Sequence, residues 1–192
     1  MRRILFDMIR SLVRAAPKGK SLIINVSLRI LGTYYGGVIN VQGFKFWIEH
    51  INALNRSLFF LGIYEPAMTV VIKEIVKPGM QVFDIGSNFG WYTLLMARCV
   101  GPEGKVYAFD IVPSLVRLLQ KNLELNHLSN VVVTRSALGN QNTVVDFYDD
   151  QLSGTANLSD QLVKNKQLDS VPMIRFDDFV QSNQIQRIDF IK

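Results

Sequence analysis

One stretch constrains this chain more than any other: Val-Phe-Asp-Ile-Gly-Ser-Asn-Phe-Gly at residues 82–90. The apolar run before Gly86 predicts a buried strand, and the sequence after Gly90 has the apolar spacing of a helix. Strand, glycine turn and helix in this order are typical of the first unit of a nucleotide-binding α/β fold. Gly86 allows a tight turn that a ligand can approach, and Gly90 allows the helix to begin close against the strand. The helix N-terminus adds unpaired N–H groups.

The polar residues of this turn separate one nucleotide ligand from another. The pattern is D-x-G-x-N-x-G, and Asn88 stands where a dinucleotide-binding fingerprint has its middle glycine. Asp84, at the strand end, would repel a pyrophosphate, which disfavours an NAD-dependent dehydrogenase. A carboxylate suits a ligand with a cationic end, such as the ammonium group of S-adenosylmethionine. An ordinary strand, turn and helix without a ligand is the alternative.

A second carboxylate follows at the distance that such a unit requires. The apolar run at residues 105–110 ends in Asp110, roughly 20 to 25 positions after the glycine turn. A carboxylate at this point can accept hydrogen bonds from both hydroxyls of a ribose. A surface aspartate at a strand end is the alternative. Residues 131–133 predict a third buried strand, and Ser136 and Ala137 follow it, where the edge of an adenine is expected.

The rest of the chain predicts an α/β fold with two parts. Strands that alternate with helices predict a Rossmann-like, mainly parallel sheet with helices on both faces. Further strands are expected at residues 143–148 and 188–192, with a long polar loop at 149–170. We expect residues 1–35 to form an N-terminal helical extension. Residues 36–192 are then the main domain, which opens with a β-hairpin at 38–49.

Composition narrows the function classes. The 192 residues are 48% hydrophobic and 19% charged, which indicates a globular chain. The one cysteine, Cys99, excludes a disulfide framework and any zinc spacing, so we predict a cytoplasmic protein and no metal site. A divalent metal stays an open question, because its carboxylates would be expected after the fourth strand. The net charge of +5 permits an acidic partner, whether nucleic acid, anionic lipid or acidic glycan.

Residues 1–15 form a basic amphipathic pattern. Their apolar residues can share one helical face, and four arginines extend from the others. A helix of this kind can lie on an anionic membrane surface, which would place the protein at the membrane periphery; a helix packed on its own domain, or a loosely ordered terminus, is the favoured alternative. The apolar residues are Ile4, Leu5, Met8, Leu12 and Val13, and the arginines are Arg2, Arg3, Arg10 and Arg14.

Several motifs together carry a family resemblance. Residues 60–66 (Phe-Leu-Gly-Ile-Tyr-Glu-Pro), 77–79 (Lys-Pro-Gly) and 84–93 (Asp-Ile-Gly-Ser-Asn-Phe-Gly-Trp-Tyr-Thr) resemble the core of FkbM-type S-adenosylmethionine-dependent methyltransferases. The Phe-Asp-Ile-Val-Pro segment at 109–113 is similar to that family's F-E-P-x-P, with Asp110 where glutamate is usual. Short matches at 136–139, 176–179 and 187–192 extend the resemblance over residues 36 to 192.

This resemblance implies a class I methyltransferase sheet with S-adenosylmethionine across the carboxyl ends of its first strands. Asp110 would hold the ribose diol, with Ile111 beside the adenine, and Glu65 would close the site. The expected reaction is O-methylation of a small molecule or glycan, and the catalytic base is unknown. The cofactor-binding residues implied are Glu65, Asp84, Gly86, Ser87, Asn88, Gly90, Asp110, Ile111, Ser136 and Ala137.

The resemblance also raises an expectation about the end of the chain. Family members continue from the Ile-Lys segment into an Asp-x-Glu-Gly stretch and further strands, whereas the last residue here is Lys192. We therefore expect a domain truncated at its C-terminus and lacking the C-terminal strands, whose fourth strand is an edge open to self-association. A catalytically inactive cofactor-binding remnant is one alternative function. A nucleic-acid methyltransferase is another, but nucleic acid is disfavoured because most basic residues are scattered.

Overall fold

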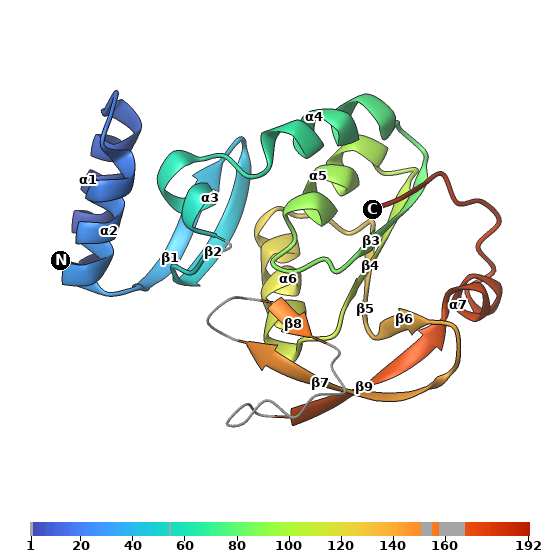
Figure 1. Ribbon diagram of the computed structural model, residues 1–192. Helices are drawn as coiled ribbons and strands as arrows, with labels where there is room; N and C mark the ends of the chain where they lie inside the picture. Colours follow the sequence, from blue (N-terminus) through green and yellow to red (C-terminus); the bar gives the residue numbers. More distant parts are fainter. Residues whose placement is uncertain (1, 54, 151–154, 158–167) are drawn as a thin grey trace. The chain divides into compact units, whose positions relative to one another are not determined.

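The computed structural model describes residues 2–53, 55–150, 155–157 and 168–192 (Figure 1). The chain forms two compact units, residues 1–66 and 67–192. The boundary therefore lies after residue 66 rather than after residue 35, and the β-hairpin expected to open the main domain belongs to the first unit. Each unit has its own core and is described by itself.

The first unit combines three helices with a β-hairpin. The hairpin turns at Gln42 and Gly43, which both have positive φ, 51° and 79°, as the tight turn of a two-stranded ribbon requires. Its antiparallel strands confirm the predicted hairpin. The elements are α1 (Arg2–Ala15), α2 (Lys20–Leu31), β1 (Tyr34–Val41), β2 (Phe44–His50) and α3 (Arg56–Leu61).

An aromatic cluster holds α1 onto this unit. The ring centroid of Phe6 lies 6.2 Å from that of Tyr35 on β1 and 5.8 Å from that of Phe59 on α3. Arg10 donates from Nε to the Phe59 carbonyl oxygen at 2.8 Å, and the Tyr35 hydroxyl donates to Asp7 Oδ1 at 2.9 Å. One face of α1 therefore packs on its own unit.

The second unit is built on a four-stranded parallel sheet of order β10-β3-β4-β5. The glycine turn joins β3 to α5, and β10 is the fourth strand, confined to two residues. The predicted strand, turn and helix are confirmed. The elements are α4 (Pro66–Ile75), β3 (Gln81–Ile85), α5 (Trp91–Val100), β4 (Lys105–Asp110), α6 (Pro113–Leu125), β5 (Val131–Arg135) and β10 (Phe190–Ile191).

Helices cover both faces of this sheet, as the alternating pattern predicted (Figure 1). On one face, Phe83 stacks on Tyr107 at 4.9 Å, and Phe109 meets Phe179 of α7 (Phe176–Ser182) at 4.8 Å between ring centroids. Neighbouring residues in a strand point to opposite faces of the sheet. Val82, next to Phe83, therefore faces α5 and α6 on the other side, together with the residue that pairs with it on β4. The expected mainly parallel, Rossmann-like α/β fold is therefore present.

A second sheet, of order β6-β9-β7-β8, follows the third parallel strand. The predicted strand at 143–148 is present as β7, but β8 and the first three residues of β9, 168–170, lie in the segment expected to be a loop. Pro172 and the polar residues at the start of β9 hide its strand pattern. Residues 151–154 and 158–167 of that expected loop lie outside the described residues. The strands are β6 (Ala137–Gly139), β7 (Thr143–Asp150), β8 (Thr155–Asn157) and β9 (Leu168–Arg175).

Candidate functional site

Backbone hydrogen bonds fix the glycine turn over the carboxyl end of β4. The N–H groups of Gly86 and Ser87 both donate to the Phe109 carbonyl oxygen, at 3.0 and 2.9 Å. Gly90 donates to the Ser87 carbonyl oxygen at 2.9 Å, and Asn88 takes a left-handed conformation with φ of 51°. The turn therefore lies beside Asp110, the last residue of β4.

The two glycines serve different purposes. A Cβ atom built on Gly86, whose φ is +74°, would meet no heavy atom within 4 Å, so its exposed backbone borders open space. A Cβ atom on Gly90, whose φ is +94°, would overlap the side chain of Leu119 on α6. Gly90 is buried and lets α5 begin close to α6, and the ligand-lining role that the family resemblance implied for it stays a prediction.

Asp110 ties the turn to the end of β4. Its Oδ2 accepts a hydrogen bond from the Asn88 N–H at 2.8 Å, and its Oδ1 accepts one from the Val112 N–H at 3.0 Å. Each carboxylate oxygen has a second lone pair available for a hydroxyl donor. Ile111, the next residue, is half-buried and packs on the cluster that contains Val112. The predicted ribose-binding carboxylate is thus held in a fixed orientation at the carboxyl edge of the sheet.

Asp84 is fully buried at the end of β3. Its Oδ2 accepts a hydrogen bond from Thr93 Oγ1 of α5 at 2.5 Å, and Lys192 Nζ lies 3.3 Å from Oδ1. Burial raises the pKa of the Asp84 carboxyl above its ordinary value, against the lowering effects of Lys192 and Thr93. The Lys192 ammonium is within ion-pair distance without hydrogen-bond geometry, so Oδ1 lacks a hydrogen bond within the described residues.

Ser87 adds a second unsatisfied polar atom at the same place. Its hydroxyl is buried and has no hydrogen-bond partner in the described part of the chain. A buried polar atom left without a partner costs about 1–3 kcal/mol, and a polar ligand at the turn would remove that cost. The open space at Gly86, the buried Asp84 carboxylate and the Ser87 hydroxyl together fit a ligand with a cationic end and ribose hydroxyls, as S-adenosylmethionine has.

The remaining predicted residues lie less directly at the turn. The Ser136 hydroxyl is within 2.8 Å of the carbonyl oxygens of both Ala137 and Pro172, and the Ala137 side chain is buried in the second sheet. The Ser136 side chain is thus hydrogen-bonded and that of Ala137 is packed, and the contact of these two residues with an adenine stays a prediction. Glu65 belongs to the first unit and has a positive φ of 36°; its role in closing the site stays a prediction.

Sequence reasoning missed the two partners of Asp84. Thr93 lies one turn into α5, so its spacing from Asp84 could have indicated it. Lys192 comes from β10's end, and its ammonium also lies 4.9 Å from the centroid of the Tyr92 ring. Only the pairing of β10 with β3 brings Lys192 to this site, and that pairing is a tertiary contact.

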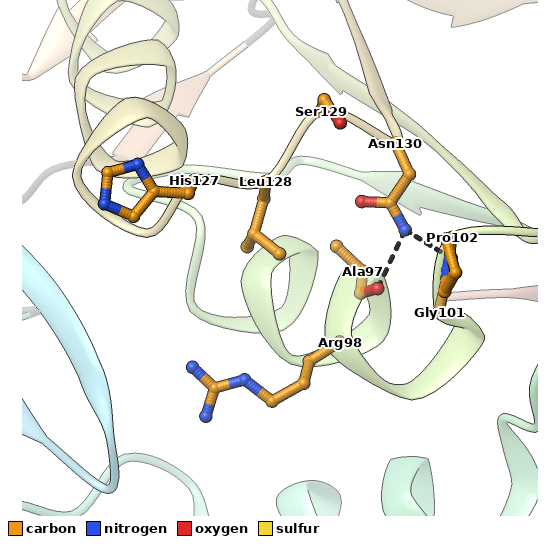
Figure 2. Close-up of a pocket in the computed structure, with 8 residues that line it drawn as sticks. All are labelled: Ala97, Arg98, Gly101, Pro102, His127, Leu128, Ser129 and Asn130. Atoms are coloured by element: carbon orange, nitrogen blue, oxygen red, sulfur yellow. Dashed lines mark hydrogen bonds between the residues drawn. The ribbon is translucent and has the colours of Figure 1, made fainter.

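A pocket of about 330 Å³ lies elsewhere, between the end of α5 and the loop before β5 (Figure 2). Asn130 closes one side, with its Nδ2 donating to the carbonyl oxygens of Ala97 and Gly101, each at 2.8 Å. His127, at the end of α6, lines the same pocket. This pocket borders the amino ends of β4 and β5, opposite the glycine turn, and is therefore separate from the cofactor site.

The strand order and the glycine turn between two carboxylates are those of the Rossmann-like fold of class I S-adenosylmethionine-dependent methyltransferases. This is the fold that the sequence predicted. S-adenosylmethionine is the cofactor that the site fits. Within the described ranges, no helix is long and apolar enough to cross a membrane. No group of three histidine, cysteine or acidic residues there is arranged to hold a metal ion.

Comparisons with known proteins narrow the relationship. Residues 62–143 match the family model for protein-L-isoaspartate(D-aspartate) O-methyltransferase. The protein-L-isoaspartate O-methyltransferase of Methanococcoides burtonii is 38% identical over 73 residues, covering 37% of this chain and 36% of that protein. That of Pyrococcus horikoshii is 38% identical over 73 residues, covering 37% and 32%. A methyltransferase structure from Aquifex aeolicus has 35% identity and a TM-score of 0.33, covering 37% of each chain.

These matches correct the finer family assignment. They support a class I methyltransferase but not the FkbM-type membership that the motifs indicated, because the matching family model is the protein-isoaspartate one. Much of that resemblance rested on the cofactor-binding segment, which the matched residues 62–143 also contain, so it did not separate the two families. The chain spans about a third of the length of the curated relatives it matches, 36% and 32% in the two named.

Proposed function

We propose that this chain carries the methyl-donor half of an enzyme that transfers a methyl group from S-adenosylmethionine to the side-chain carboxylate of an isoaspartyl residue in a protein. The observation that supports it is the glycine turn between Asp84 and Asp110, which lies inside the segment similar to protein-isoaspartate methyltransferases. The names of those relatives favour a protein acceptor over the small molecule or glycan that the sequence motifs suggested.

In this proposal the protein positions the reactants. S-adenosylmethionine supplies a methyl group that is bonded to a positively charged sulfur. When the methyl group is transferred, the sulfur takes the bonding electron pair and leaves as the neutral thioether of S-adenosylhomocysteine, so the leaving group needs no protonation. Asp84 binds the ammonium group, and Thr93 holds that carboxylate in place. Asp110 accepts the ribose hydroxyls while the main-chain N–H of Asn88 fixes its orientation. Holding the two reactants in line at the carboxyl edge of the sheet supplies the rate enhancement.

A carboxylate acceptor agrees with a site in which the described residues present no identified base. A carboxyl group has an ordinary pKa near 4 and is ionised at neutral pH, so its oxygen attacks without losing a proton. A hydroxyl acceptor needs a general base within hydrogen-bond distance. For isoaspartyl methylation, this domain therefore has to orient the two reactants and exclude water from them, and it does not have to transfer a proton.

The test uses a matched pair of peptides. The full chain is incubated with S-adenosylmethionine labelled in its methyl group and with two peptides that differ only in one isoaspartyl or aspartyl residue. We expect base-labile methyl ester on the isoaspartyl peptide, at least about tenfold above the aspartyl peptide, since one misplaced methylene disrupts an in-line geometry. The Asp84→Asn variant should give none.

Two results would contradict the proposal in different ways. Equal labelling of the two peptides would support methyl transfer by this chain but contradict the proposal that the acceptor is an isoaspartyl residue. Binding of S-adenosylhomocysteine without labelling of either peptide would favour the cofactor-binding remnant. That second candidate is supported by the confinement of the family match to residues 62–143, around the cofactor turn.

A further inference from the structure

The face of α1 that points away from its own unit is apolar. Phe6 and Val13 are fully buried on the inner face. Ile4, Met8 and Leu12 follow one another at four-residue spacing and are 66%, 64% and 56% exposed. Residues four apart share one face of a helix, and this face lies opposite Phe6. Helix α1 thus has two apolar faces. The face with Phe6 packs on its own unit, and the face with Ile4, Met8 and Leu12 is exposed.

The neighbouring helix α2 repeats this arrangement. Ile24 is buried on its inner face, whereas Leu22, Val26 and Ile30 are 68%, 46% and 74% exposed at the same four-residue spacing. The two helices pack against each other, and together they display a set of large apolar side chains that marks an interaction surface. We call this set the N-terminal apolar surface; it comprises Ile4, Leu5, Met8, Leu12, Leu22, Val26 and Ile30.

The same two helices carry the positive charge of the chain. Residues 1–32 contain seven lysines and arginines and one acidic residue, Asp7. The remaining residues contain 14 basic and 15 acidic side chains, which nearly balance. The net charge of +5 is therefore a property of the helices that bear the N-terminal apolar surface.

Part of this positive charge serves the fold, and part is unpaired. Arg10 and Arg14 donate to the carbonyl oxygens of Phe59 and Phe60, at 2.8 and 3.1 Å, and so hold α1 to α3. The remaining cations differ. Across the described ranges, Lys18, Lys20 and Arg29 have no carboxylate partner, and Arg29 lies on α2 next to Ile30.

We propose that the N-terminal apolar surface binds the surface of an anionic phospholipid bilayer. The apolar side chains enter the boundary between headgroups and acyl chains, and Lys18, Lys20 and Arg29 contact lipid phosphates. Each such cation strengthens the attraction to an anionic membrane. Helices of 14 and 12 residues are too short to span a bilayer, which takes about 20 residues, so they lie on it.

Charge decides between a bilayer and a second copy of the chain. A contact between two N-terminal apolar surfaces would bring seven basic residues of each copy together, with one acidic residue each to offset them. Such like-charge juxtaposition opposes association. An anionic bilayer supplies both the apolar layer and the opposite charge, and is the occupant that this surface fits.

Vesicle flotation of the full chain tests this without any methyl acceptor or cofactor. We expect binding to vesicles of equal parts phosphatidylcholine and phosphatidylglycerol, at least about tenfold stronger than to pure phosphatidylcholine and reduced by added salt. Equal binding to both vesicle types, or binding to neither, would overturn the proposal.

Surface variants test each half of the interaction. Met8→Ser combined with Leu12→Ser should reduce vesicle binding at least about tenfold, because each removes an inserted apolar side chain. Lys18→Glu combined with Lys20→Glu should abolish the preference for anionic vesicles. Val144→Ser, at a site on β7 that is 66% exposed, is the matched control and should bind as the unmodified chain does. Circular dichroism confirms that each variant is folded.

A fluorophore sensitive to polarity gives an independent reading of contact. In a Cys99→Ser background, the only cysteine is the one introduced by Leu12→Cys or by Val144→Cys. Anionic vesicles should shift the emission of the label at position 12 to the blue and leave the label at 144 unchanged. Self-association in solution that the Met8→Ser, Leu12→Ser variant removes, with no blue shift, would assign the surface to a second copy and overturn the proposal.

Discussion

Replacing Asp84 by asparagine is expected to weaken the binding of S-adenosylhomocysteine at least about 100-fold, because removing one partner of a buried charge pair costs about 3–5 kcal/mol. The Asp84 carboxylate is fully buried, and Thr93 orients it by a hydrogen bond of 2.5 Å. Asparagine keeps the size of the side chain and removes its charge. Calorimetric titration of the variant measures the loss directly.

The same variant is expected to be more stable at neutral pH when no ligand is bound. Burial raises the pKa of Asp84 in the folded chain, so the ionised carboxylate opposes folding. This opposition is absent below the ordinary pKa of 3.8, grows as the pH rises from there to the higher pKa of the folded state, and stays constant above it. The melting temperature of Asp84→Asn should therefore exceed that of the unmodified chain at pH 7, and the difference should vanish near pH 4.

The exposed carboxylate of Asp146 on β7 provides the control. Asp146→Asn should change neither the melting temperature nor the affinity for S-adenosylhomocysteine. Unchanged affinity in Asp84→Asn would remove the ammonium-binding role from Asp84. A lower melting temperature at neutral pH would show that the pairing with Lys192 outweighs the cost of burial.

Replacing Asp110 by alanine is expected to lower both stability and affinity. The N–H groups of Asn88 and Val112 would each lose their acceptor on this carboxylate, at about 1–3 kcal/mol for a buried donor left unpaired. The glycine turn would lose its tie to β4, and the ribose would lose its acceptor. The expected results are a melting temperature several degrees lower and loss of S-adenosylhomocysteine binding by titration.

Asp110→Asn separates the two roles of this residue. Its amide oxygen can still accept from one of the two N–H groups, so part of the stability should return. Ligand affinity should stay low, because an amide nitrogen in place of a carboxylate oxygen cannot accept from a ribose hydroxyl. Full affinity in Asp110→Ala would contradict the ribose-binding role. Together the two carboxylates are predicted to act alike on binding and oppositely on stability.

The central part of the second unit could be predicted from the sequence because its signals are local. The apolar run before Gly86, the glycine turn and the carboxylate at the end of the next apolar run are each encoded within a few residues. Asp84 and Asp110 lie where their spacing from the glycine turn predicted them, one on each side of the turn. The parallel order of the strands followed from the alternation of strands and helices.

The parts that escaped prediction depend on contacts between distant residues. The boundary after residue 66 reflects an aromatic cluster of Phe6, Tyr35 and Phe59, which come from three separate elements. The ion pair of Lys192 with Asp84 depends on the pairing of β10 with β3. The strand β9 carries Pro172 and polar residues at its start, so the register with β7 that makes it a strand is not visible in its own sequence.

Calorimetric titration of the unmodified full chain with S-adenosylhomocysteine tests the central claim most directly. This ligand keeps the ammonium group and the ribose that the two carboxylates of the glycine turn are proposed to bind. We predict saturable binding in the micromolar range at one site per chain. A chain that is folded by circular dichroism and shows no heat of binding would contradict the assignment of the turn as a cofactor site.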